Sequence, residues 1–270
     1  MSAPTTNPSA RAGIRLPSRL DDVPTQGVPF GRLVRAELRK GVDTRAGRWL
    51  LAAIGIITLL VLCAVLFTGG SEGKDFESFV MVTYLPQSFL LPVVGILLVT
   101  AEWSQRTGLA TFTLEPRRIR VGLAKLVASW VFGVLVVCAG VVIAAIATVL
   151  GMMLRGTDPT WGVEWQSVVG LFLGQLVVIS MGVAFGMILQ NTPAAIVTYL
   201  LLPMVWSILG ESISWLKDAA MWLDTNATLL PLYEANMTGD AWAKLGTSIA
   251  VWVVIPLAAG LWRLTRSEVK

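Results

Sequence analysis

Six long apolar runs separated by short polar segments restrict the fold of this chain more than any other feature. Each run is long enough, at about 1.5 Å per residue, to cross most or all of a hydrocarbon layer about 30 Å thick as an α-helix. Hydrophobic residues make up 55% of the 270 residues and charged residues only 14%, a balance that a soluble domain does not need. The sequence therefore predicts an all-α, polytopic membrane protein. Its expected spans lie at about residues 49–67, 79–101, 126–150, 167–189, 193–209 and 245–264.

The basic residues predict how these spans are oriented. Lys and Arg precede the first run, and Arg263, Arg266 and Lys270 follow the last one. Since short cytoplasmic segments are enriched in Lys and Arg, we expect both termini in the cytoplasm. The net charge of +4 is explained by these flanking residues, which meet anionic lipid headgroups. No nucleic-acid partner is predicted.

The N-terminal region divides into two parts. Residues 1–27 are rich in Ser, Thr, Pro and Gly and predict a disordered cytoplasmic tail. From Pro29 to Lys40, apolar residues recur at helical spacing, which predicts an amphipathic helix in the inner membrane interface. A solvated basic helix with an incidental apolar stripe is the alternative. The polar face carries Arg32, Arg35, Arg39 and Lys40.

Residues 102–125 form a polar, basic connection between the second and third spans, which we expect on the cytoplasmic side. Glu102 and Arg106 are four residues apart and can pair across one helical turn. Pro116 disfavours helix at Glu115 and should separate a short helix from the next span. For residues 102–108 we favour contact with another protein. For Arg117, Arg118 and Arg120, membrane orientation alone explains the charges equally well.

The spans themselves carry few polar positions. Gly170, Gly174, Gly182 and Gly186 form two pairs spaced by four, which predicts close packing of the fourth span on a neighbour. Prolines at 86 and 92 should bend the second span. Thr192 is expected to cap the fifth span, and residues 211–244 are expected to form broken amphipathic helices in the outer leaflet. Candidate pathway positions are Gln87, Gln175 and Ser180.

The residue types that are missing exclude several classes of function. The chain has no histidine, and its two cysteines, Cys63 and Cys138, lie in apolar runs. A His-containing metal site and a Ser-His-Asp triad are therefore not predicted, and no Walker-type nucleotide-binding loop is present. The predicted spans contain essentially no ionisable residues, which weighs against an ion-coupled secondary transporter. A non-transporting assembly or scaffold factor stays open.

These features together resemble the membrane subunit of ABC-2-type ATP-binding-cassette transporters, particularly the compact permeases of actinobacteria. The resemblance covers about residues 28–266. It includes the amphipathic elbow helix before the first span, the broken outer helices before the sixth, and a motif after the second. The Thr107-Gly108 order inverts the Gly-Thr order that is frequent in the family. The motif positions are Glu102, Thr107, Gly108, Pro116, Arg118 and Lys125.

The resemblance implies a function for the whole chain, with residues 28–270 as the permease domain. The chain would be a non-catalytic export permease in a bacterial plasma membrane, with no cofactor of its own. ATP and Mg would be bound by a separate ATPase subunit, and a second permease subunit would complete a homodimer or heterodimer. The loop at 102–125 would form a coupling helix seated on the ATPase. The implied coupling residues are Glu102, Arg106, Thr107, Gly108, Pro116, Arg117, Arg118 and Lys125.

Overall fold

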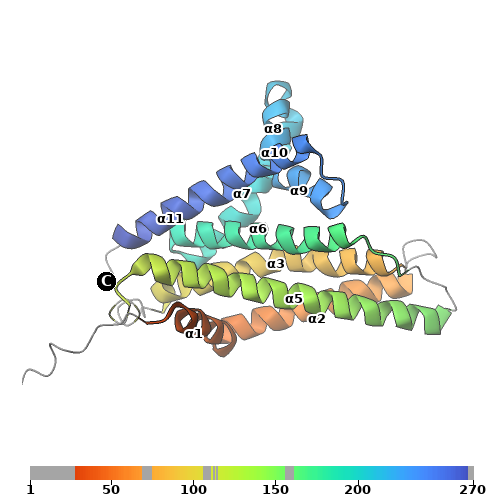
Figure 1. The fold of residues 1–270 in the computed structure, drawn as a ribbon, viewed down its shortest axis with the longest axis horizontal. Coiled ribbons are helices and arrows are strands. Elements are labelled where there is room, and N and C mark those ends of the chain that lie inside the picture. The colour runs from red at the N-terminus through yellow and green to blue at the C-terminus, as the bar shows by residue number, and fades with distance from the viewer. Residues whose placement is uncertain are drawn as a thin grey trace, which may run out of the picture.

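The computed structural model describes residues 28–68, 75–105, 111, 113, 115–155 and 161–266. Regular secondary structure in these residues is entirely helical. Six helices are long and apolar enough to cross a membrane, so the predicted all-α fold with six candidate spans is confirmed (Figure 1). The six are α2 (Arg45–Thr68), α3 (Phe76–Ser104), α5 (Arg118–Arg155), α6 (Trp165–Leu189), α7 (Thr192–Ser212) and the continuous segment Gly239–Arg266.

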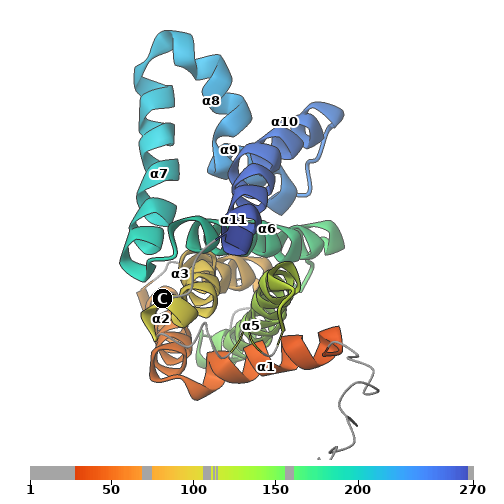
Figure 2. The ribbon, with the colours of Figure 1, turned by 90° about the vertical axis from the view of Figure 1, so that its left-hand side faces the viewer.

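Helix α1 (Phe30–Asp43) precedes the first span and is amphipathic, as its sequence pattern predicts. It contacts α5, α2 and α3, and it lies against one side of the bundle in Figure 2. Arg32, Arg35 and Arg39 are exposed, whereas Glu37 and Gly41 are buried. Glu37 is a charged residue on the apolar face of this helix, and the ionic cluster described below explains how its charge is accommodated.

Helices α3 and α6 form the centre of the bundle and are the two most buried spans. Leu91, Val94 and Leu98 of α3 share one apolar core with Ile179 and Val183 of α6. Pro92 lacks the N–H that would bond to the Ser88 carbonyl one turn earlier. The Tyr199 hydroxyl of α7 donates to that carbonyl at 3.3 Å, so a neighbouring helix satisfies the group that the proline frees.

The spaced glycines of α6 lie at close helix contacts. A Cβ at Gly182 would stand 2.7 Å from the carbonyl oxygen of Pro92 on α3, and one at Gly170 would collide with the Leu232 carbonyl of α9 (Thr225–Tyr233). A Cβ at Gly174 would likewise collide with the ring of Tyr233. At Gly186 the nearest atom, Ile96 Cα, is 3.4 Å away, an ordinary contact. The small residues thus bring α6 close to both α3 and α9.

The C-terminal third contains two candidate spans and, between them, short helices that stand beside the bundle (Figure 2). Helix α7 leads through a 3₁₀ turn (Ser214–Leu216) and α8 (Lys217–Leu223) to α9, and then come α10 (Gly239–Ile249) and α11 (Ile255–Arg266). A π-helical turn, Ala250–Val254, joins the last two. Pro256 follows that turn and cannot donate to the Trp252 carbonyl, a common cause of local rearrangement within a helix.

Three boundaries differ from the sequence-based expectations. Helix α5 begins at Arg118 rather than near Leu126, because Pro116 ends the preceding segment and nothing interrupts helix after it. Asn191, not Thr192, caps α7: its side chain accepts the N–H of Ala194 at 3.0 Å. The last span begins at Gly239 rather than near Leu245, capped by Thr238. The predicted tail at 1–27 lies outside the described residues.

Two alanine substitutions on α6 test this packing. Gly182→Ala should lower the free energy of unfolding by about 1–3 kcal/mol, because the new methyl group meets the backbone of α3. Gly186→Ala is the matched control and should be neutral or slightly stabilising, since it removes backbone entropy from the unfolded chain without a collision. Denaturant titration of both variants in detergent micelles measures the difference. Equal stability of the two variants would contradict the close α3–α6 approach.

Candidate functional site: a buried ionic cluster beside the central connection

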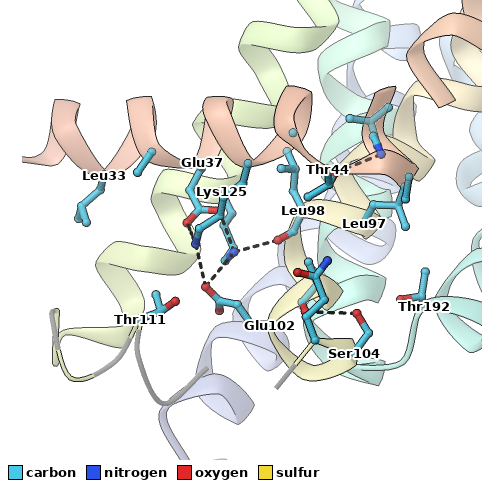
Figure 3. A pocket seen from close by; sticks show the side chains of 18 of the residues that line it. Leu33, Glu37, Thr44, Leu97, Leu98, Glu102, Ser104, Thr111, Lys125 and Thr192 are labelled. Carbon is cyan, nitrogen blue, oxygen red and sulfur yellow. Dashed lines mark hydrogen bonds and ion pairs between the residues drawn. The ribbon is translucent and has the colours of Figure 1, made fainter. Parts of the chain in front are cut away.

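Four charged side chains from three helices meet near the end of α3 (Figure 3). Lys125 of α5 contacts Glu37 Oε2 of α1 at 2.8 Å and Glu102 Oε1 of α3 at 3.2 Å. Lys40 of α1 contacts Glu37 Oε1 at 2.7 Å and Glu102 Oε1 at 3.3 Å. Two carboxylates and two ammonium groups therefore form one connected network.

Three of the four side chains in the network are buried. The side chains of Lys125 and Glu102 are each 2% exposed, and that of Lys40 is 41% exposed. Lys125 donates hydrogen bonds to Glu37 Oε2 and to the Leu98 carbonyl, each at 2.8 Å, and its contact with Glu102 is an ion pair. Removing one partner from such a site leaves a buried charge unpaired and is strongly destabilising. The cluster thus ties α1 to α3 and α5.

The ionic partners shift the pKa values of the two α1 side chains. Burial alone would raise the pKa of Glu37, but the Lys125 and Lys40 ammonium groups outweigh burial and hold that pKa below its ordinary value. Burial would likewise lower the pKa of Lys40, but Glu37 and Glu102 raise it. Both residues of α1 are therefore held in their charged forms at neutral pH.

A cavity of about 590 Å³ lies between α1 and the C-terminal part of α3 and borders on the cluster. Leu33 and Ala36 line it from α1, and Leu97, Leu98 and Ala101 line it from α3. Its polar lining includes all four members of the cluster together with Thr111 and Glu115. Glu102 Oε2 is buried and has no hydrogen-bond partner among the described residues.

A second set of ionic contacts fixes the start of α5. Arg120 donates to Glu115 Oε2 at 2.9 Å and to the Val28 carbonyl, just before α1, at 2.8 Å. Arg118 donates to the Leu264 carbonyl of α11 at 3.1 Å. Two of the three predicted arginines therefore hold parts of the chain together, while Arg117 is exposed. Pro116–Arg120 and Thr265 line a further cavity of about 510 Å³.

The predicted coupling residues are brought together only in part. Glu102 and Lys125 meet directly, whereas Arg106, Thr107 and Gly108 lie outside the described residues. Among the described residues, Glu102 pairs with Lys40 and Lys125. This pairing is buried and does not lie on an exposed surface. The partner that sequence reasoning missed is Glu37. The sequence does carry a signal for it, because Glu37 falls among Leu33, Val34 and Leu38 on the apolar face of α1.

The candidate pathway residues are buried in the packed bundle. Ser180 accepts a hydrogen bond from Trp130 Nε1 at 2.8 Å, and Gln87 packs against Gly140. Neither amide atom of Gln175 has a hydrogen-bond partner in the described part of the chain. These three residues stay candidates for a pathway; in this conformation the described cavities are lined by other residues.

Comparison with known proteins does not identify a family for this chain. Neither protein-family models nor curated proteins gave a match to the chain. Within the described residues, no group of acidic or Cys side chains is placed to hold a metal ion.

The lowered pKa of Glu37 predicts an acid-sensitive contact. A carboxylate with a depressed folded-state pKa contributes stability above its unfolded-state value, here about 4.5, and loses it as pH falls through the lower folded-state pKa. Thermal unfolding midpoints of the native chain should therefore fall more steeply below about pH 4.5 than those of Glu37→Gln. Parallel pH profiles for the two proteins would contradict the ionic role of Glu37.

Proposed function

We propose that the chain is the membrane subunit of an ABC-2-type exporter, driven by ATP hydrolysis on a separate ATPase chain. The observation that carries the proposal is the Glu37–Lys40–Glu102–Lys125 cluster. It joins the amphipathic helix α1 to both helices that flank the central connection. The family resemblance of the connection itself, from Glu102 to Lys125, supports the same reading.

The cluster would transmit a movement of the central connection to the helix bundle. A partner that displaced residues 105–117 would act on the end of α3 and the start of α5. Through Glu102 and Lys125 these two ends are bonded to each other and to α1. Paired buried charges resist separation, so the three helix ends would move as one body. Arg120 joins the start of α5 to the residues just before α1 through a hydrogen bond to the Val28 carbonyl.

The proposed orientation places this end of the molecule at the cytoplasmic surface. Exposed Arg32, Arg35 and Arg39 on α1 would then meet anionic headgroups, which attract basic residues by about 1 kcal/mol each. Helix α1 would act as the elbow in the interface. Exposed apolar faces of α2 and α7 would contact lipid and the second permease subunit, as homodimer or heterodimer.

A proton-coupled secondary transporter is the second candidate. The predicted spans lack ionisable residues, but α3 and α5 extend beyond those spans and carry Glu102 and Lys125 in buried positions. Intramembrane carboxylates are the usual proton carriers in such transporters. Acidification of proteoliposomes upon substrate flux, without any ATPase chain, would favour this candidate over the exporter.

The ATPase partner is tested with the native complex. Tagged chain is purified from its own membranes, and copurifying proteins are labelled with a photoreactive ATP analogue. We expect a labelled ATPase chain with the native sequence and at least about tenfold less of it with Arg106→Ala/Arg117→Ala, since each lost ion pair or charged hydrogen bond costs about 1 kcal/mol or more.

Arg48→Ala provides the control for that experiment. Arg48 is exposed near the start of α2 and lies outside the central connection, so its loss removes one positive charge without touching the proposed contact. Membrane insertion should be unchanged in all variants. Absence of any ATP-labelled partner with the native chain, or equal recovery with the double variant, would refute the exporter proposal.

A further inference from the structure

The cavity between α1 and α3 combines an apolar lining with one buried acceptor that lacks a donor. We infer that it binds an amphipathic molecule with a primary ammonium head, which donates a hydrogen bond to Glu102 Oε2. This inference concerns the isolated chain and does not depend on an ATPase partner. Figure 3 shows Glu102 directed toward Glu37 and Lys125, with Thr111 on one side of it and Leu33 farther along α1.

The size and lining of the cavity suit a small amphiphile. Its volume of about 590 Å³ lies within the range of about 300–1,000 Å³ that is typical of ligand pockets. Leu33, Val94, Leu97 and Leu98 supply apolar surface for a hydrocarbon body. The charged lining consists of the four members of the cluster together with Arg32 and Glu115, and pairing with the cluster would fix the orientation of the head.

One carboxylate oxygen of the cluster, Glu102 Oε2, has no hydrogen-bond donor among the described residues. Glu37 accepts from Lys40 on one oxygen and from Lys125 on the other. Glu102 Oε1 is within 3.3 Å of both ammonium groups, whereas Glu102 Oε2 has no donor among the described residues. A buried carboxylate oxygen without a donor keeps its full desolvation cost, so a ligand that supplies the donor gains affinity there.

The chemistry of this acceptor selects a primary ammonium. A carboxylate only accepts hydrogen bonds, and bonds from a charged donor are roughly twice as strong as neutral ones. The 41% exposed Lys40 side chain forms the outer contact, at 3.3 Å. Its ammonium can return to water when a ligand head enters. A quaternary ammonium has the charge but no N–H to donate.

Matched octyl compounds test the inference on the purified chain in a non-ionic detergent. Octylamine, octanol and octyltrimethylammonium share one hydrocarbon chain and differ in the head group, so their partition into micelles is measured separately and affinities are compared at equal free concentration. Thermal unfolding midpoints measured against ligand concentration give apparent affinities. We expect octylamine to bind about tenfold more tightly than either of the other two, because only octylamine supplies a charged N–H donor.

Three variants locate the effect. Glu102→Gln should abolish the preference for octylamine, and Glu77→Gln, the same change at the other end of α3, should retain it. Ala101→Phe fills the cavity without altering the cluster, so it should abolish binding of octylamine even if Glu102→Gln fails to fold. Equal affinities for the three octyl compounds, or an unchanged preference in Ala101→Phe, would overturn the inference.

A second arm separates a free amine from a lipid headgroup of the same chemistry. The chain is reconstituted in nanodiscs that contain equal amounts of phosphatidylethanolamine and phosphatidylcholine, and bound lipid is identified by native mass spectrometry. Enrichment of phosphatidylethanolamine that is lost in Ala101→Phe assigns the site to the lipid. Octylamine preference without such enrichment assigns it to a free amine. Without a preference for octylamine the inference fails, whichever lipid is bound.

Discussion

A charged group that leaves water must find an opposite charge, and this requirement organises the described part of the protein. Glu37, Glu102 and Lys125 are each 3% exposed or less, and they come from three different helices. Neither carboxylate can be buried favourably without an ammonium group beside it, and Lys125 pairs with both. Apolar contacts bring α3 and α6 together, but contacts between apolar faces have little directional preference. The ionic cluster adds a specific position for α1 on the bundle.

This position links local geometry to the proposed function. The cluster lies where α3 ends and α5 begins, on either side of the connection that resembles a coupling segment. Arg118 and Arg120 extend the same network to α11 and to the residues before α1. A force applied at the connection would therefore reach four helices through charged hydrogen bonds. The cavity proposed to bind a ligand lies beside the same cluster.

The sequence predicts the helices better than their partners. Six spans and the amphipathic α1 follow from hydropathy and helical spacing, because backbone groups in a bilayer must bond within the helix. The Glu102 partners could not be read in this way, since pairing depends on which helices pack together. Glu37 and Lys125 are 88 residues apart, and only its place on the apolar face marks Glu37 as buried. The cap at Asn191 was missed by one residue, because Asn and Thr are both good N-caps.

A double-mutant cycle between Glu37 and Lys125 tests most directly whether the cluster holds α1 on the bundle. Glu37→Gln, Lys125→Met and the double variant are unfolded by denaturant in micelles, and the free energies of unfolding are compared. Residues in one ionic network show interaction energies of about 0.5–3 kcal/mol, and we expect a value in the upper half of that range for this buried pair. Additive effects of the two substitutions would contradict the account.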